Sequence, residues 1–374
     1  MASFPNNTNL TDSYFSIDYM REPDAVKMFK LGIEALMAFF GIVGNIGVCL
    51  VTSRHARMKT TMNLYIRNLA IADLGLLTVS FPLAIVRQEL DTWPLGEFIC
   101  KYIYPGSDIF YGVSVWTITV IAFERYRNII VKRQRSKCSI NTVYRRNAII
   151  WFTAFVIQCV PLYIYMDYDR KTEICSVEFP SEAGKRVSTL SQVYTIAFLA
   201  LLYVIPLVVI SWTNIKISQR ICQSSLFYKR MYKENKTEIS ESGLILFSRN
   251  CDNTSVVNTR SKMHKKEDIL SFNSLRKEEN KRLKQNKKAR KILTPLVAVF
   301  AITMLPFHVV KVIATYCIEL RTFPYYWVLF SVCGFLIVVN SCMNPLIYAM
   351  VSRDYRKAFK KLFQFNRRVK EQDH

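Results

Sequence analysis

The stretch VVNSCMNPLIYAM, residues 338–350, sets two asparagines, a serine and a proline into an otherwise apolar run. Proline removes a backbone donor and bends a helix, and polar side chains nearby can satisfy the groups that the bend frees. Polar residues inside a membrane span are costly, so by default they indicate function. The stretch predicts a membrane helix bent at Pro345, with a polar network beside the bend.

Six further apolar runs accompany this one in a chain of 374 residues, of which 51% are hydrophobic. Each run has about the 20 residues that a helix needs to cross roughly 30 Å of hydrocarbon. The seven runs lie near residues 29–53, 62–86, 99–128, 147–166, 190–216, 289–318 and 324–350. We therefore expect an all-α membrane protein, a seven-transmembrane helix bundle.

Lys and Arg residues gather in alternate loops, which sets the orientation of such a bundle. The segments SRHARMK (53–59), RYRNIIVKRQRSK (125–137) and RDYRKAFKKLF (353–363) are strongly basic, whereas QELDTWPLGEF (88–98) is mixed. This asymmetry predicts a multi-pass plasma-membrane protein with an extracellular N-terminus and a cytoplasmic C-terminus. The net charge of +23 then faces anionic lipid, and its spread over separate loops argues against nucleic-acid binding.

The polar segments divide the chain around the bundle of residues 29–350. Residues 1–28 form the expected extracellular segment, in which Asn6 and Asn9 lie in sequons for glycosylation. Residues 217–288 form a long third cytoplasmic loop, predicted to be largely disordered because it is charged and poor in aromatic residues. Residues 351–374 begin with apolar positions at helical spacing among basic ones, which predicts a short amphipathic helix on the bilayer and a cytoplasmic tail.

Each apolar run also carries a short motif. In order these are Gly44–Asn45, the segment NLAIAD ending at Asp73, the triplet Glu124–Tyr126, Trp151, Pro206, the spacing FxxxxxP from Phe300 to Pro306, and NPxxY from Asn344 to Tyr348. With these motifs in order, the sequence resembles the rhodopsin-like (class A) G-protein-coupled receptors over roughly residues 29–364. The resemblance implies a receptor, not an enzyme, that activates heterotrimeric G proteins when an extracellular ligand binds.

The resemblance assigns roles at both ends of the bundle. At the extracellular mouth it implies a disulfide between Cys100 and Cys175, beside Trp93. At the cytoplasmic end, Arg125 would pair with Glu124 in one state and bond backbone carbonyls of an inserted partner in another, because its planar fork serves either geometry. The residues expected in G-protein coupling and switching are Glu124, Arg125, Tyr126, Phe300, Met304, Pro306, Asn344, Pro345 and Tyr348.

A carboxylate inside the second run needs a partner, because an isolated charge in hydrocarbon is too costly to keep ionised. Asp73, with Ser114, Asn340 and Asn344, resembles the sodium site of the family. Sodium is the one ion that we expect, and no other cofactor. The alternative is a water-filled polar network without a specific ion, in which these groups join helices to one another.

Three departures from the family pattern concern the switch. Met304 stands where the family usually has a tryptophan, and Asn214 stands where a tyrosine normally supports the active state. The foot of the sixth run has Asn286 and Arg290 where an acidic residue can restrain Arg125. We therefore expect a loosely held inactive state with measurable basal signalling, and a trigger at Phe300.

The ligand is constrained mainly by exclusion. No lysine lies in the seventh run, which excludes a retinal Schiff base there. Counting from Arg125 puts Ser107, not Asp108, at the position that binds biogenic amines, although Asp108 could face the pocket from a neighbouring side. The segment CSVEFP (175–180) resembles the Cys-x-Glu-x-Trp-Pro pattern of some neuropeptide receptors, with one residue displaced. A hairpin there, with acids such as Glu173, would leave an open mouth suited to a basic or amidated peptide.

We therefore expect a neuropeptide ligand, with two alternatives: a receptor for a lipid or small metabolite, or a non-signalling decoy. The residues expected to line the pocket are Gln88, Asp108, Gln192, Tyr194, His308, Lys311 and Tyr326. Receptor kinases and arrestin are expected partners at the third cytoplasmic loop, because the tail beyond Ser352 has no serine or threonine. The loop offers Thr237, Ser240, Ser242, Ser271 and Ser274.

Overall fold

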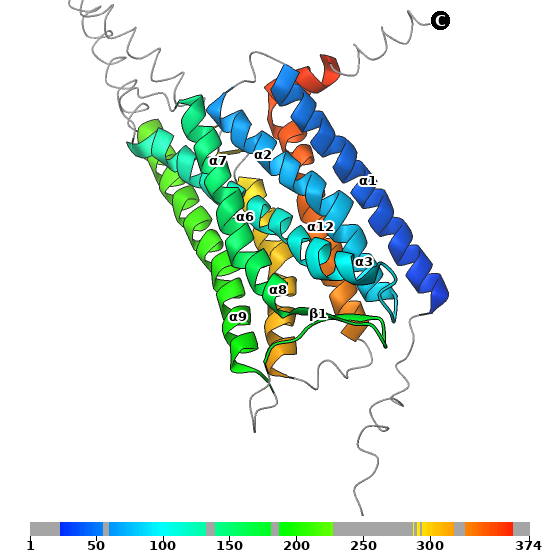
Figure 1. The fold of residues 1–374 in the computed structure, drawn as a ribbon. Helices are drawn as coiled ribbons and strands as arrows, with labels where there is room; N and C mark the ends of the chain where they lie inside the picture. The colour runs from blue at the N-terminus through cyan, green and yellow to red at the C-terminus, as the bar shows by residue number, and fades with distance from the viewer. Residues whose placement is uncertain are drawn as a thin grey trace, which may run out of the picture.

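The computed structural model describes residues 23–54, 60–131, 139–180, 187–226, 287, 290, 291, 294–317 and 326–361. Within these residues, seven helices are long and apolar enough to cross a membrane, which confirms the predicted bundle (Figure 1). The first to seventh spans are Asp24–Arg54, Thr61–Glu89, Gly96–Ile130, Ile140–Tyr165, Thr189–Leu226, Thr294–Tyr316 and Val328–Val351.

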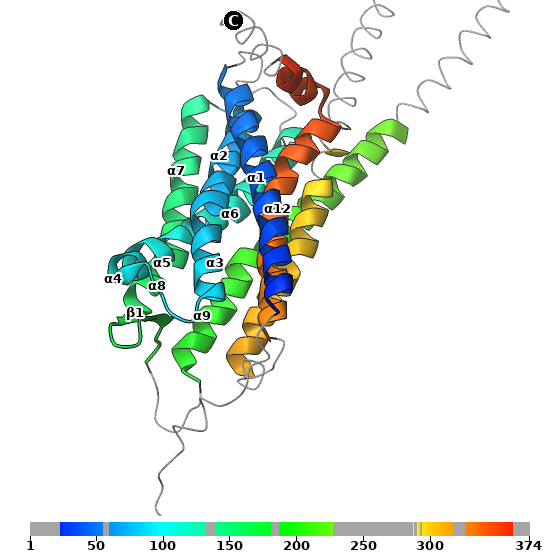
Figure 2. The ribbon, with the colours of Figure 1, turned by 90° about the vertical axis from the view of Figure 1, so that its right-hand side faces the viewer.

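The labelled elements divide these spans further. The first span is α1 (Asp24–Arg54), and the second contains α2 (Thr61–Gly75) and α3 (Phe81–Glu89). The third contains α4 (Gly96–Phe98), α5 (Tyr104–Ser107) and α6 (Ile109–Tyr126), and the fourth contains α7 (Ile140–Ala154) and α8 (Val160–Tyr165). The fifth begins with α9 (Thr189–Leu199), and the seventh lies within α12 (Tyr326–Val351). Strands β1 (Met166–Asp169) and β2 (Ile174–Val177) pair antiparallel, as the predicted hairpin. The hairpin lies at the end of the bundle away from the C-terminal helix (Figure 2).

Four spans widen into a π-helical turn just before a proline. These turns are Leu76–Ser80 before Pro82, Ile99–Ile103 before Pro105, Phe155–Cys159 before Pro161, and Ala200–Val204 before Pro206. Proline has no N–H to donate and its ring crowds the carbonyl four residues earlier, so the preceding turn relaxes to a wider spacing. All four turns lie in the half of the bundle nearer the hairpin.

Three helix boundaries differ from the expected ones. The first span begins at Asp24, inside the segment 1–28 that we expected to be extracellular, and the fourth begins at Ile140 instead of near 147. The fifth continues to Leu226, beyond the expected end at 216, because Ile217 and Ile221 are one helical turn apart and both are buried. The third cytoplasmic loop therefore starts later than residue 217, and most of it lies outside the described residues.

The first span packs closely along the seventh because glycines line its inner side. A Cβ atom would meet Cys342 at Gly41, Pro345 at Gly44 and Phe359 at Gly47. Small residues at such spacing let two membrane helices approach closely, which replaces the hydrophobic effect as the source of contact energy. The first span thus contacts α12 directly at Pro345.

The C-terminal helix of residues 353–361 confirms the helix predicted after the seventh span. Tyr355 and Ala358 are buried, and Phe359 packs beside them, while the basic positions between them are exposed. The Tyr355 hydroxyl donates to Asn63 Oδ1 at 3.2 Å, and its ring lies 5.5 Å from that of Tyr348. The helix is thus attached to the second and seventh spans by one side chain.

Candidate functional site

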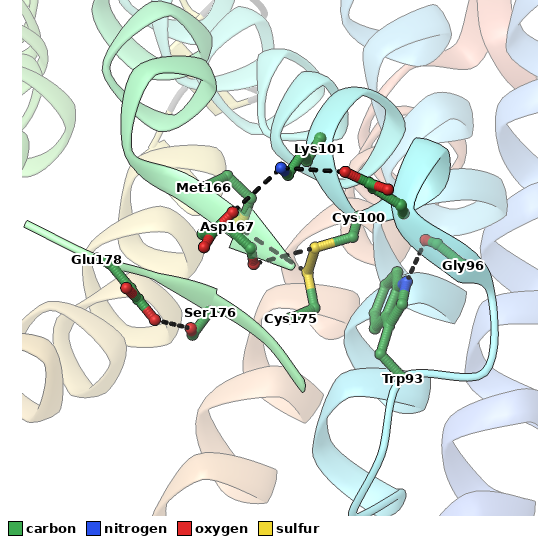
Figure 3. Close-up of a disulfide and its surroundings, with 10 residues drawn as sticks. Trp93, Gly96, Cys100, Lys101, Met166, Asp167, Cys175, Ser176 and Glu178 are labelled. Carbon is green, nitrogen blue, oxygen red and sulfur yellow. Dashed lines mark hydrogen bonds and ion pairs between the residues drawn. A yellow bond between two sulfur atoms is a disulfide. The ribbon is translucent and has the colours of Figure 1, made fainter. Parts of the chain in front are cut away.

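A disulfide between Cys100 and Cys175 joins the third span to β2, as predicted (Figure 3). Both cysteines are buried with Trp93 and Met166 in a small apolar cluster. The Trp93 indole N–H donates to the carbonyl of Gly96 at 3.1 Å, so the tryptophan fixes the loop before the third span. The expected brace at the mouth of the bundle is present.

Polar contacts fasten the hairpin to the same span. Lys101 pairs with Asp167 at 3.1 Å, Arg170 pairs with Glu97 at 2.6 Å, and the Trp93 backbone N–H donates to the Glu173 carbonyl at 2.7 Å. Lys101 holds the pKa of the Asp167 carboxyl below its usual range, so this pair persists until the pH falls well into the acid range. Exposed ion pairs contribute little each. The disulfide and the backbone bond therefore do most to make the hairpin move with the third span.

A cavity of about 430 Å³ opens beneath the hairpin, with Met166 and Val177 on its rim. The second to seventh spans contribute its walls, which are mostly apolar, and the fourth contributes Leu162. Asp108 from the third span and Lys311 from the sixth are its two charged lining residues among those described. A largely apolar concavity with few polar groups is the usual form of a ligand site.

Aromatic rings form the inner wall of the cavity. Tyr111 and Phe198 stack with their centroids 6.2 Å apart, and Phe307 meets Tyr111 edge to face at 6.2 Å. His308 lies behind them, 1% exposed, with Nε2 at 2.9 Å from the Tyr111 hydroxyl. His308 therefore supports the wall and does not itself line the cavity.

Lys311 lies over aromatic rings and forms no ion pair with a carboxylate of the described residues. Its Nζ is 3.5 Å from the centroid of Phe198 and 5.2 Å from that of Tyr194. Asp108 is the acidic group that acts on it electrostatically, but no ion pair or hydrogen bond joins the two in the described part of the chain. A cation over ring faces is attracted by their quadrupoles.

The Gln158 side chain of the fourth span binds the backbone of the third span at Asp108. Its side-chain amide is buried and is oriented with the nitrogen facing the Asp108 carbonyl. The nitrogen donates to that carbonyl at 2.9 Å, and the amide oxygen accepts from the Gly112 N–H at 3.1 Å. The amide thereby competes with the helical bond between these two backbone groups, which is long at 3.4 Å. The regular helix is interrupted at Asp108, between α5 and α6, three residues after Pro105 and beside this amide, and Asp108 lines the cavity there.

Replacing Gly112 by alanine is expected to lower the free energy of unfolding by about 2 kcal/mol, the scale of lost buried hydrogen bonds. The new Cβ would occupy the space of the Gln158 amide, which must leave. Thermal unfolding of the purified protein measures the change. The control is Gly32→Ala, where nothing lies within 4 Å of the new atom. Equal stability of the two variants would show that the amide contributes nothing.

The remaining expected pocket residues lie apart from the cavity. Gln88 donates to the Ser331 hydroxyl at 2.5 Å and so ties the second span to the seventh. Tyr194 stands beside Lys311, with its ring 5.7 Å from that of Phe179. Gln192 and Tyr326 are half-buried near the ends of their helices and do not line it. Of the seven expected residues, Asp108 and Lys311 are the ones that face it.

Asp73 forms the centre of a polar network in the middle of the bundle. Its carboxylate is 0% exposed and accepts from Asn344 Nδ2 at 2.7 Å and from the Ser114 hydroxyl at 3.0 Å. The Ser341 hydroxyl lies beside it, yet it makes no geometrically satisfactory hydrogen bond to any described residue. Asn340 instead accepts from Thr303 at 3.4 Å and joins the seventh span to the sixth.

The oxygen atoms around Asp73 are of the kind that bind a small hard cation. Oxygen atoms are the ligands that such ions prefer, and the Asp73 carboxylate, the Ser114 hydroxyl and the unpaired Ser341 hydroxyl converge there. The Asn45 side chain closes the network by donating to the carbonyls of Gly41 and Ser341 at 2.9 and 3.2 Å. Three of the four expected sodium residues, Asp73, Ser114 and Asn344, are thus brought together.

Glu124 is paired with two arginines other than its sequence neighbour. Its carboxylate is 4% exposed and accepts from Arg127 at 3.0 Å and from Arg146 of the fourth span. Arg146 also donates to the Tyr65 hydroxyl at 3.4 Å. Glu124 therefore joins the third, fourth and second spans at the end away from the hairpin.

Arg125 makes no ion pair with Glu124 in the described residues, so the structure is not the state in which we expected these two to pair. The half-buried guanidinium lies near the phenols of Tyr348 and Tyr355. The Tyr348 hydroxyl and the Asn214 side-chain oxygen are buried, and neither has a hydrogen-bond partner among the described residues. Tyr348 and Tyr355 are therefore close to Arg125, but neither forms a hydrogen bond with it in the described part of the chain.

Met304 and Phe300 lie in the main apolar core between the cavity and Arg125. Both are almost completely buried, together with Val115 and Ile118 of the third span. The ring of Phe300 is 6.1 Å from that of Tyr203, whose hydroxyl donates to the Ala301 carbonyl at 3.0 Å. The fifth and sixth spans are therefore linked at the height where the family usually has its tryptophan.

Sequence reasoning did not single out Tyr111, Phe198 or Gln158. Gln158 carried a usable signal, because it is an uncharged polar residue inside an apolar run, as Asn45 is. Phe198 follows Tyr194 by one helical turn, which places the two rings on one face. Tyr111 had no such signal, since aromatic residues are frequent throughout the spans.

The chain is similar in sequence to a known protein family and to several named proteins. A family described as 7 transmembrane receptor (rhodopsin family) matches residues 44–348. Neuropeptide Y receptor type 2 of Sus scrofa is 25% identical over 358 residues, covering 92% of this chain and 80% of that receptor. The same receptor of Homo sapiens is 24% identical with the same coverage, and that of Gallus gallus is 26% identical, with 92% and 79% covered.

Proposed function

Because the chain belongs to the rhodopsin family of seven-transmembrane receptors, we propose that it converts binding of an extracellular peptide into nucleotide exchange on a heterotrimeric G protein. As a multi-pass plasma-membrane receptor it is a signalling protein and not an enzyme. The hairpin end is the extracellular end in this proposal, and the end with Arg125 is cytoplasmic. The charge asymmetry of the loops supports that orientation.

The cavity beneath the disulfide-bonded hairpin is the main observation that supports this function. It opens at the end opposite Arg125, and the buried core around Phe300 lies between the two. A ligand that contacts the third, sixth and seventh spans there binds unequally to two helix arrangements. Such differential affinity shifts the population toward one of them, and no covalent chemistry is needed.

A peptide is favoured as the ligand by two observations. The relatives are named neuropeptide Y receptors, and the hairpin above the cavity has exposed acids such as Glu173 and Glu178. A lipid or small metabolite is the second candidate, because the cavity walls are largely apolar. A non-signalling decoy would bind ligand without coupling, and Met304 and Asn214 favour it.

The test is G-protein dissociation measured in cells for each Gα family, first without ligand and then against a neuropeptide library that includes amidated peptides. We expect a peptide response that Arg125→Ala abolishes at equal surface expression. We also expect basal coupling above that of mock-transfected cells, since no carboxylate among the described residues pairs with Arg125. Silence from peptides with basal coupling would redirect the search to lipids or metabolites. Silence throughout would favour the decoy.

Sodium is expected to lower basal nucleotide exchange about fivefold or more relative to potassium at equal ionic strength. Asp73, Ser114 and Ser341 would hold the ion and favour one arrangement of the helices, the usual size of such a coupling being 1–3 kcal/mol. Nucleotide exchange in membranes measures the effect, and Asp73→Asn should remove it. An unchanged sodium effect in that variant would favour the water-filled network.

Receptor kinases and arrestin remain proposed partners at the third cytoplasmic loop. Thr237, Ser240, Ser242, Ser271 and Ser274 lie outside the described residues, as do Asn6 and Asn9, the proposed glycosylation sites. The C-terminal helix presents its basic side chains away from the bundle, which supports its proposed position on anionic lipid.

A further inference from the structure

Two opposite charges face the cavity without neutralising each other. Asp108 is presented by the break in the third span, and Lys311 extends from the sixth span over the face of Phe198. Neither has an ion-pair partner in the part of the chain that the structure describes, and the surrounding walls are mostly apolar. Charges in such surroundings lose hydration, and they regain free energy when a counter-charge arrives.

The two charged groups are also held in place. The inserted Gln158 amide bonds both sides of the helix break that carries Asp108, at 2.9 and 3.1 Å. The Lys311 ammonium is surrounded by the rings of Phe198, Tyr194 and Phe307, at 3.5, 5.2 and 5.9 Å. Fixed charges in a poorly hydrated site discriminate more strongly between ligands than mobile ones, because little reorganisation is needed on binding.

We propose that this cavity recognises an amphoteric ligand group, with its cation at Asp108 and its carboxylate at Lys311. On the function proposed above, that group is the unblocked C-terminal end of a peptide that carries a basic group nearby. A cavity of about 430 Å³ admits the end of a peptide and leaves the rest beneath the hairpin. An amidated end lacks the anion and leaves Lys311 without a counter-charge.

The competing explanation is that Asp108 and Lys311 serve as each other's counter-ion through water, while the ligand binds by apolar contact alone. Under that explanation, removal of either charge changes the affinity for all ligands alike. Under the proposal, Lys311 distinguishes a carboxylate from an amide, and Asp108 distinguishes a cation from a neutral group. The test therefore depends on selectivity and not on absolute affinity.

The experiment uses the full-length receptor in nanodiscs and two tetrapeptide pools of identical random composition, one ending in a free carboxylate and the other in an amide. Binding is measured by the shift in thermal unfolding, which does not depend on G-protein coupling. We expect the carboxylate pool to bind about 10- to 100-fold more tightly, the size of one charge-assisted hydrogen bond. In Lys311→Met this preference should disappear.

Matched variants separate the cavity from general electrostatics at the mouth. Lys101→Met removes a lysine that pairs with Asp167 outside the cavity, and it should keep the preference. Asp108→Asn should lose the preference for peptides with a basic residue over neutral ones, whereas Asp167→Asn should keep it. All four variants must first give an unfolding transition close to that of the parent receptor. Where Lys311→Met does not, Lys311→Gln replaces it.

The outcomes separate the inference from the proposed function. Equal binding of the two pools, or preference for the amide, overturns the inference, while a G-protein response to those pools would keep the peptide receptor. Free amino acids form a third probe set. Their binding without that of either pool would support the amphoteric site and overturn the peptide as its ligand. No binding by any of these probes overturns the inference.

Discussion

Replacing Glu124 by glutamine is expected to lower the free energy of unfolding by about 2–3 kcal/mol without raising basal nucleotide exchange. The carboxylate is buried and neutralises Arg127 and Arg146, so its loss leaves two cations close together. Breaking a buried pair costs about 3–5 kcal/mol, and the partial exposure of both arginines reduces that cost. Arg125 is not bound by Glu124, so the substitution releases nothing that would engage a G protein.

Chemical or thermal unfolding and basal nucleotide exchange, measured on the same membranes, test this expectation. The control is Glu97→Gln, which removes a carboxylate paired with Arg170 and Lys101 at the exposed hairpin end and should leave both quantities nearly unchanged. Raised exchange with unchanged stability in Glu124→Gln would mean that Glu124 does hold Arg125 in the dominant state.

Asn344→Leu is expected to lower the free energy of unfolding by about 2–3 kcal/mol, because it removes the donor at 2.7 Å from the Asp73 carboxylate. The side chain that remains has a similar size, so the cost arises from the unsatisfied carboxylate and not from a void. The same substitution in an Asp73→Asn background should cost much less, because an amide tolerates the loss of one donor better than a charge does.

The four receptors of this double-mutant cycle are compared by thermal unfolding in a potassium buffer, so that sodium does not compensate for the lost donor. A coupling of at least about 1 kcal/mol is expected between the two positions, since they are in direct contact. Additive effects would show that Asn344 acts on the bend at Pro345 and not on the carboxylate.

The sequence predicted the bundle because a backbone in hydrocarbon must satisfy its hydrogen bonds internally, which an α-helix does. A helix that crosses the hydrocarbon needs about 20 apolar residues, and such runs are visible in the sequence. The disulfide followed from the family resemblance, and the C-terminal helix from the spacing of Tyr355, Ala358 and Phe359. The late end of the fifth span was missed because Ile217 and Ile221 lie in a mostly polar segment. Two buried residues one turn apart were enough to extend the helix.

The pocket could be predicted only in part. Counting from Arg125 put Ser107 at the position that binds biogenic amines, with Asp108 on a neighbouring side. The π turn Ile99–Ile103 and the interruption of the helix at Asp108 change the angle per residue, so a count along a regular helix does not give the direction of either side chain. Both residues line the cavity. Contacts such as Lys311 over Phe198 depend on rotamers of separate spans, which no local pattern encodes.

The wide turns that precede four prolines also divide the bundle mechanically. Beyond them the same helices run regularly, over 15 residues in α2, 18 in α6 and 15 in α7. A turn that lacks tight backbone bonds is compliant, whereas an unbroken helix is stiff along its axis. We therefore expect a ligand that presses on the wide turns near the hairpin to change the tilt of the third span, whose regular helix α6 carries Arg125.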